Sequence, residues 1–294
     1  MRSALALSLL KIISLLPLGL ARFLGGIMGA IMMIFTTGAY KTTQQNLVHC
    51  LPNNSAKANK LLAKSRMKHL GQTFFETPVL WRRSTDWLQS KIVAIEGEAY
   101  FKEAIANDRG TILLIPHQGN WEVIGLWAAK QTAMTSLYQP PKNSQLGDWI
   151  KNSRERTGAH LVPTNVRGVA ALLKALGRGE TVAILPDQQP PKVSGDFAPL
   201  FEKPALTMTL AYNLLNRSDS QALFCTALRE KGGWRLHFVP ADQAIYSEDQ
   251  AISLKAMNHG IESIAAQAMD QYQWEYKRFR AQPEGSPSIY LSGS

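Results

Sequence analysis

The chain has 294 residues, of which 45% are hydrophobic and 18% charged, and 32 Lys and Arg against 22 Asp and Glu give a net charge of +10. This apolar content suffices for one large domain or two small ones and excludes a disordered chain. With Cys50 and Cys225 as the only cysteines, a disulfide scaffold, a Cys₄ zinc site and a CxxC redox motif are excluded, and a reducing compartment is expected. The positive charge indicates an anionic partner, either nucleic acid or a membrane surface.

The first 40 residues are almost wholly apolar. Between residues 3 and 40 the only charges are Lys11 and Arg22, eleven positions apart. In a single helix these two would share a face with small residues, namely Gly25, Gly29 and Thr36. The uncharged run 23–40 is near the lower limit for a spanning helix, which needs about 17 to 25 residues.

We therefore expect residues 1–40 to form a membrane-anchoring helix that either spans the bilayer or lies in its interface. A cleaved signal peptide is the third interpretation, but the apolar run continues past the poor cleavage site at residues 19–21.

A basic pattern follows the apolar segment. Four lysines recur at helical spacing opposite four apolar residues: Lys57, Lys60, Lys64 and Lys68 against Ala63, Met67, Leu70 and Phe74. A basic helix beside an anchor suits the anionic cytoplasmic leaflet of a membrane. Taken alone, these lysines fit the solvated face of an ordinary amphipathic helix equally well, and their position after the anchor favours the membrane.

From about residue 92, short β-rich runs alternate with helical patterns. Strands are predicted at 111–116, 135–138, 160–163, 181–186, 222–228 and 234–239, and helices near 98–107, 121–131, 145–157, 167–177, 204–217 and 250–270. This order predicts an α/β fold with a mixed, centrally parallel sheet flanked by helices. The connection 187–204 is too long for a plain turn. Residues 41–294 are expected to be one catalytic domain.

The most informative segment is Ile-Pro-His-Gln-Gly-Asn-Trp-Glu at 115–122, which ends a predicted buried strand and opens a helix. Ligands bind at this edge of α/β sheets. The reversal at Gly119 and Asn120 can bring the carboxylate of Glu122 to His117. His117 would then act as a general base toward a hydroxyl. Backbone N–H groups at the helix start would stabilise an oxyanion. The spacing alone also fits a helix cap beside a surface histidine. No metal is expected, because only two ligand-type residues are present.

Several segments then resemble, in order, the HtrB/LpxL/LpxM-like lysophospholipid acyltransferases, which include the lipid A biosynthesis late acyltransferases. After the hydrophobic amino terminus these are His117–Glu122, Tyr138–Asn143, Asn152–Gly158, Gly179–Gln189 and Gln271–Phe279. The chain departs from the family pattern at Gln118, where an aromatic residue is common, and at 200–204, where the family often has Phe-Phe-Gly. Both departures are expected to alter the pocket for the acyl chain or the substrate entrance.

The resemblance implies a fold like that of glycerol-3-phosphate acyltransferase. It also implies transfer of an acyl chain from an acyl-carrier-protein thioester to a hydroxyl of a lipid A precursor, without a cofactor, on the cytoplasmic side of the inner membrane. His117 would be the general base, and Glu122 would orient it and balance its charge.

The resemblance also implies which residues bind the substrate. Arg154 and Arg156 are expected to bind a phosphate or carboxylate, although both also fit a solvated helix end. Asn120 and Asp187 complete the expected substrate-binding set, although Asp187 also fits the cap of the following turn.

Two alternatives stay open. The same dyad can acylate another membrane lipid, such as a lysophospholipid or a glycosylated phospholipid. A non-catalytic peripheral protein that binds anionic lipid is the second alternative, and it would be indifferent to the loss of His117 and Glu122. Nucleic acid is not expected as a partner, because the positive charge clusters near the anchor and no binding motif occurs.

Overall fold

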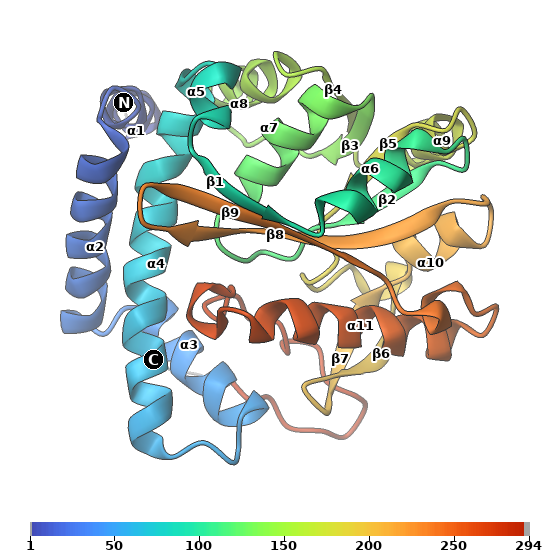
Figure 1. Cartoon of the computed structure of the whole chain (residues 1–294). Coiled ribbons are helices and arrows are strands. Elements are labelled where there is room, and N and C mark those ends of the chain that lie inside the picture. Colours follow the sequence, from blue (N-terminus) through green and yellow to red (C-terminus); the bar gives the residue numbers. More distant parts are fainter. Residues whose placement is uncertain (1, 291–294) are drawn as a thin grey trace.

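A seven-stranded sheet forms the centre of the molecule in the computed structural model, which describes residues 2–290 (Figure 1). Its strands lie in the order β1 (Ile92–Glu96), β9 (Gly233–Pro240), β8 (Gln221–Glu230), β2 (Thr111–Leu114), β5 (Thr181–Ile184), β3 (Met134–Tyr138) and β4 (Ala159–Pro163). All neighbouring strands are parallel except the β8–β9 hairpin. The predicted mixed, centrally parallel sheet is therefore confirmed.

Helices cover both faces of this sheet. They are α5 (Thr85–Gln89), α6 (Glu98–Ala106), α7 (Trp121–Gln131), α8 (Ser144–Glu155), α9 (Val166–Leu176), α10 (Leu210–Leu215) and α11 (Gln250–Ala266). The central strand β2 alternates between two buried clusters: Ile112 and Leu114 pack in the cluster that includes α9 and α11, and Leu113 packs in the cluster that includes α6 and α7. The run of successive apolar residues is explained by this two-sided burial.

The amino-terminal segment is a set of helices and not the single anchor helix expected over 1–40. These helices are α1 (Arg2–Ile13), α2 (Leu18–Ile34), α3 (Gly38–Cys50) and α4 (Ala56–Arg82). The break comes at Pro17, because a proline disfavours helical geometry at the residue before it. Lys11 and Arg22 therefore lie on different helices, and Thr36 lies outside both with φ +44°.

None of the described helices is by itself both long and apolar enough to cross a membrane. By length and composition, α2 and α3 pass that test only as a pair bent by 79°.

Glycines let α2 lie directly against α4, the two long helices at the left of Figure 1. A Cβ on Gly25 would lie 2.5 Å from the carbonyl oxygen of Gly71, and a Cβ on Gly29 would lie 2.3 Å from that of Met67. The two backbones can approach this closely only because these positions lack side chains. Of the apolar residues expected on the inner face of α4, Ala63 and Met67 are buried, whereas Phe74 is exposed.

The sequence missed several elements, among them one edge strand and one hairpin. Strand β1 pairs with β9 at the sheet edge. The predicted loop after Asp187 contains the 3₁₀ turn Lys192–Ser194 and a hairpin of β6 (Gly195–Leu200) and β7 (Lys203–Met208). The helix predicted over 204–217 is therefore wrong in its first half and begins only at Leu210.

Candidate active site

Two parallel neighbours, β2 and β5, bring a histidine and a carboxylate together. Leu114 pairs with Ile184, and His117 and Asp187 each lie three residues beyond that pair. The Nδ1 atom of His117 lies 2.7 Å from Oδ1 of Asp187, and the His117 backbone N–H donates to Oδ2 at 2.8 Å. Both residues are buried. Asp187 thus holds the ring and the backbone of His117 at once.

This contact sets the protonation pattern of the imidazole. An ionised carboxylate can only accept hydrogen bonds, so Nδ1 carries the hydrogen and Nε2 keeps a free lone pair. The side-chain nitrogen of Gln188 lies 3.2 Å from that Nε2 and donates to Oε1 of Gln273 at 2.9 Å. The ring of Trp121 packs at 4.7 Å between centroids. Nε2 is therefore the atom of His117 that can take a proton from a hydroxyl.

Glu122 has a different partner from the one expected. Arg154 binds its carboxylate through Nη2 and through Nε at 3.0 Å, and the indole nitrogen of Trp81 donates to it at 3.1 Å. Within residues 2–290, no hydrogen bond joins Glu122 to His117. The carboxylate that orients the imidazole in this structure is that of Asp187, because Glu122 is turned toward α8.

The charge of Glu122 acts on Arg154. Burial works to lower the pKa of Arg154, but the Glu122 carboxylate outweighs it and holds that pKa above its ordinary value. The guanidinium also lies over the ring of Tyr138, 5.5 Å from the centroid. Since Nε and Nη2 bind Glu122, Nη1 is the nitrogen of this side chain available to a substrate oxygen.

His117 and Glu122 open onto one cavity of about 590 Å³. Arg154 and Gln188 also line its polar wall. The rest of the wall is largely apolar and includes Leu126, Met134, Leu137, Leu161, Ile184 and Met208. Polar groups that converge at one side of an apolar cavity are typical of a site for a ligand with a reactive head and a hydrocarbon chain.

Three residues of the expected substrate-binding set do not line this cavity: Asp187, which binds His117, and Asn120 and Arg156. Asn120 is fully buried, and its side-chain nitrogen donates to Oε2 of Glu76 at 3.2 Å. Arg156 donates through Nη2 to the carbonyl oxygen of Leu80 at 2.7 Å, and burial lowers the pKa of Arg156. Neither lines the cavity wall, so the structure gives no support to their expected role in substrate binding.

The reversal between His117 and Glu122 needs glycine at 119. Gly119 has φ +60°, and a Cβ there would lie 2.0 Å from the carbonyl oxygen of Ala227. Its N–H donates to Gln271, and the N–H of Asn120 donates to Ala227, both at 3.0 Å. These two N–H groups are therefore used inside the protein, and the oxyanion donors expected at the helix start would be N–H groups of the first turn of α7, which begins at Trp121.

The sequence did not assign three residues of the site. Gln188 directly follows Asp187 at the edge of the sheet, so its position was available from the strand pattern. Tyr138 ends β3 at the same edge, and its pKa is raised by burial. Trp81 comes from α4, and nothing in its local sequence marks it.

The sequence is similar to known proteins over nearly its whole length. Residues 2–281 match the family described as bacterial lipid A biosynthesis acyltransferase. The lipid A biosynthesis palmitoleoyltransferase of Escherichia coli K12 is 28% identical over 284 residues, which covers 94% of this chain and 90% of that protein. The lipid A biosynthesis lauroyltransferase of the same organism is 25% identical over 294 residues, covering 97% and 94%.

A Haemophilus influenzae lipid A biosynthesis acyltransferase is 25% identical over 299 residues, covering 97% of this chain and 93% of that protein. The family match includes the cavity, the His117–Glu122 segment and the amino-terminal helices. The chain is therefore an acyltransferase and belongs to the bacterial lipid A biosynthesis acyltransferase family.

Proposed function

We propose that this protein transfers a fatty acyl chain from an acyl-carrier-protein thioester to a hydroxyl of a lipid A precursor. The observation that carries the proposal is the Asp187-bound His117, whose Nε2 atom lies at the polar end of a largely apolar cavity. The apolar wall suits a hydrocarbon chain, and the imidazole suits a hydroxyl nucleophile. The relatives' names supply the lipid A acceptor.

In the proposed reaction, Nε2 of His117 takes the proton of the acceptor hydroxyl while the hydroxyl oxygen attacks the thioester carbonyl carbon. The tetrahedral intermediate collapses as the carbon–sulfur bond breaks. The leaving thiolate then recovers the proton from the imidazolium, so the ester forms without a covalent enzyme intermediate. The amide of Gln188 covers Nε2, and the acceptor hydroxyl takes its place when substrate binds.

Asp187 and Glu122 have separate tasks in this proposal. Asp187 keeps Nδ1 protonated and stabilises the imidazolium that forms, as carboxylates do for catalytic histidines. Glu122 fixes the guanidinium of Arg154 at the cavity wall, where Nη1 can donate to a carbonyl or phosphate oxygen of the substrate. This assignment moves the orienting role from Glu122 to Asp187 and keeps Arg154 as a substrate ligand.

We further propose that the amino-terminal helices attach the enzyme to the cytoplasmic face of the inner membrane. Helices α1 and α2 and the turns that follow them expose large apolar side chains: Leu9, Ile12, Leu15, Leu20, Phe23, Ile27, Ile31, Ile34 and Phe35. The opposite surface of α2 is packed on α4 through Gly25 and Gly29. A helix that packs on the protein with one side and is apolar on the other can lie flat in the membrane interface.

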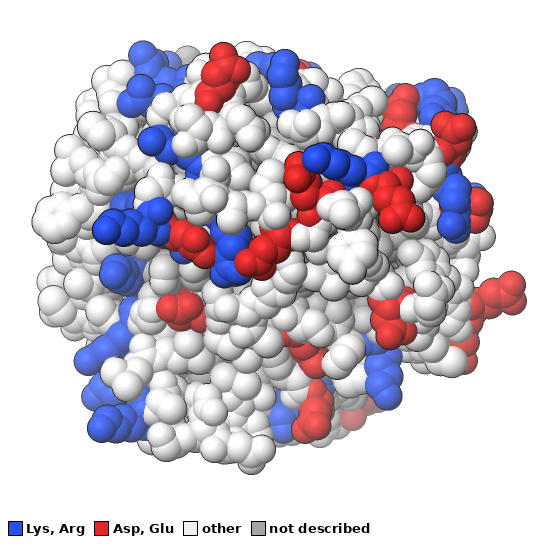
Figure 2. All heavy atoms as spheres, in the orientation of Figure 1, with Lys and Arg blue, Asp and Glu red and all other residues white. Residues whose placement is uncertain are grey.

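Charge flanks the apolar surface. Figure 2 shows an uncharged outer surface where Figure 1 places α2, and Lys and Arg side chains gather beside it over α4. The lysines of this region, all exposed, are Lys57, Lys60, Lys64 and Lys68. Each basic residue near an anionic leaflet contributes about 1 kcal/mol to binding. This arrangement favours an anionic membrane surface as the partner.

Membrane attachment can be tested by flotation with vesicles of phosphatidylethanolamine and phosphatidylglycerol. Phe23→Asp places a charge on the apolar surface, because Phe23 is 64% exposed, and it should release the protein from the vesicles. Val166→Asp makes the same kind of change on α9, at a residue that is 86% exposed, and should leave flotation intact. Equal flotation of the two variants would contradict this mode of attachment.

The reaction is tested by mass spectrometry of lipid A from cells with and without the gene. Loss of a secondary acyl chain should be reversed by the wild type and not by His117→Ala or Glu122→Ala. Glu98→Ala removes an exposed carboxylate of α6 and serves as the matched control. If expressed wild-type protein leaves lipid A unchanged, the acceptor is a different lipid; if His117→Ala restores the chain fully, the mechanism is wrong.

A further inference from the structure

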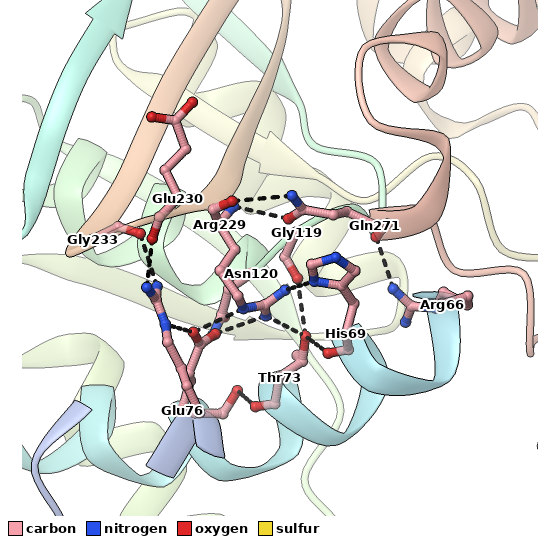
Figure 3. A network of polar contacts seen from close by, with 12 residues as sticks. Arg66, His69, Thr73, Glu76, Gly119, Asn120, Arg229, Glu230, Gly233 and Gln271 are labelled. Carbon is pink, nitrogen blue, oxygen red and sulfur yellow. Dashed lines mark hydrogen bonds and ion pairs between the residues drawn. The ribbon is translucent and has the colours of Figure 1, made fainter. Parts of the chain in front are cut away.

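A buried carboxylate on α4, Glu76, collects four hydrogen bonds from three other elements (Figure 3). Arg22 of α2 donates through Nε at 2.5 Å, Arg229 of β8 donates through Nε at 2.8 Å and through Nη2 at 2.7 Å, and Asn120 donates at 3.2 Å. The Glu76 side chain is completely shielded from solvent. Burial acts to raise the pKa of Glu76, but Arg229 and Arg22 outweigh it and hold that pKa below its ordinary value.

Arg22 is fully committed to this cluster. Its Nη1 donates to the carbonyl oxygen of Glu230 at 2.6 Å, its Nη2 donates to that of Gly233 at 2.8 Å, and its Cζ lies 4.9 Å from the centre of a Trp234 ring. A charged side chain in an apolar amino-terminal helix therefore faces the protein and not a lipid. An unpaired buried charge is costly, so Arg22 ties α2 to Glu76 and to the β8–β9 hairpin.

The same cluster holds the reversal that separates His117 from Glu122. Asn120 is bound to Glu76 through its side chain. The hydroxyl of Thr73 shares its hydrogen between the carbonyl oxygens of Gly119 at 3.1 Å and His69 at 3.0 Å, and it accepts from Nη2 of Arg229 at 2.8 Å. Gly119 and Asn120, two consecutive residues of the reversal, are thus hydrogen-bonded to side chains that contact Glu76 or Arg229. Figure 3 shows these contacts.

We propose that Arg22 is a positioning residue for acyl transfer: it fixes the carboxylate of Glu76 so that Asn120 and the whole His117–Glu122 segment keep their places. The proposal rests on the proposed function. Its consequence is that α2 is part of the catalytic framework as well as the membrane-facing helix. A change that displaces α2 then slows the chemical step even where no membrane is present.

The test uses the purified full chain in detergent micelles, with an acyl-carrier-protein thioester and a lipid A precursor. Arg22→Gln should lower kcat by up to about 100-fold with KM nearly unchanged, because a small displacement of a reacting group costs this much. Arg22→Lys keeps the charge without the guanidinium fork and should recover part of kcat. Arg235→Gln is the control, since Arg235 lies on the same hairpin and binds the carboxylates of Glu96 and Glu230 at the surface.

A double-mutant cycle with Asn120→Ala separates positioning from stability. If Arg22 acts through Asn120, the double variant should match Asn120→Ala in kcat to within about two-fold. Multiplicative losses, or wild-type kcat in Arg22→Gln, would overturn the proposal. If Arg22→Gln does not fold, Arg22→Lys replaces it in the double-mutant cycle with Asn120→Ala. A wild-type chain that transfers nothing contradicts the proposed function instead, so the two failures are distinct.

Discussion

Adjacent glycines on α2 give a direct measure of how tightly this helix is held. Both Gly25 and Gly26 lie inside the helix, so replacement by alanine favours helix formation by about 1 kcal/mol at either position. Only Gly25 meets backbone: its Cβ would lie 2.5 Å from the carbonyl oxygen of Gly71 and 2.7 Å from Cα of Gln72, whereas a Cβ on Gly26 would meet only a side-chain carbon of Lys68 at 3.8 Å.

The difference between the two variants therefore isolates packing, because the helix-propensity contribution cancels. Overpacking of this kind costs about 1 to 3 kcal/mol. We expect Gly26→Ala to be more stable than wild type and Gly25→Ala to be less stable. At about 2 °C per kcal/mol for a chain of this size, the two Tm values should differ by roughly 2 to 6 °C.

The assay is thermal unfolding in detergent, followed by tryptophan fluorescence at one scan rate, together with kcat. Arg22 lies one turn before Gly25, so a shift of α2 in Gly25→Ala should also weaken the bond to Glu76 and lower kcat. Gly26→Ala should keep kcat. Equal Tm values for the two variants would refute the close α2–α4 contact, and unchanged kcat in a destabilised Gly25→Ala would refute its link to the active site.

Three further outcomes follow from single contacts. Asp187→Asn should lower kcat by about 100- to 10,000-fold in a steady-state assay, because an amide no longer fixes the tautomer of His117. Activity near that of wild type would contradict the role of Asp187. Gly119→Ala, whose Cβ would lie 2.0 Å from the carbonyl oxygen of Ala227, should lower kcat and Tm together. Burial lowers the pKa of His69 in the folded protein, so below pH 6.5 the His69 side chain is protonated more readily in the unfolded chain than in the folded one. The free energy of unfolding should therefore fall as the pH is lowered. Denaturant titrations from pH 7 to pH 5 should show this fall, and His69→Gln should make it smaller.

The sequence predicted which residues lie at the carboxyl edge of the sheet, but it did not predict which of them contact each other. Buried apolar runs located β2 and β5, and the residues just after them, including His117 and Asp187, were expected at the same edge. That these strands are direct neighbours is a property of the whole sheet, because β3 and β4 come between them in the sequence and lie to one side in space. Without that order, the nearest carboxylate in sequence, Glu122, was the natural partner for His117.

Long-range pairing decides which group each polar residue near the site contacts. Arg154 fits a solvated helix end when only α8 is considered, and its partner Glu122 lies on α7. Asn120 fits a substrate ligand when only its motif is considered, and its partner Glu76 lies on α4. Local patterns describe what a residue can bind. Which group reaches it depends on packing between elements far apart in the sequence.

The hairpin after Asp187 was hidden by its composition. Pro199 and Pro204 face each other across β6 and β7, and proline normally argues against a strand. The turn between them uses two residues at positive φ, Phe201 at +50° and Glu202 at +61°, where glycine or asparagine is the usual sequence marker. A two-stranded sheet has only edges, so the prolines cost it few hydrogen bonds.

The segment from His117 to Glu122 is held by contacts to elements on every side, which limits where specificity can reside. Asp187 and Glu76 hold His117 and Asn120, and Arg154 holds Glu122. Gln118, which departs from the family pattern, is fully buried and donates to the carbonyl oxygens of Ala265 and Ala268 at the end of α11.

Gln118 is therefore absent from the cavity wall, although it was expected to alter either the acyl pocket or the substrate entrance. Since each contact of this segment fixes a group that the proposed mechanism uses, substitutions here should change the rate and not the choice of chain. The choice of acyl chain then falls to the apolar wall, where Met134, Leu137 and Leu161 from β3 and β4 line the cavity and bind no catalytic group. Replacing Leu137 by a smaller residue enlarges that wall and should shift the preferred acyl length upward, as measured by mass spectrometry of the product, while kcat with the preferred chain stays near that of wild type.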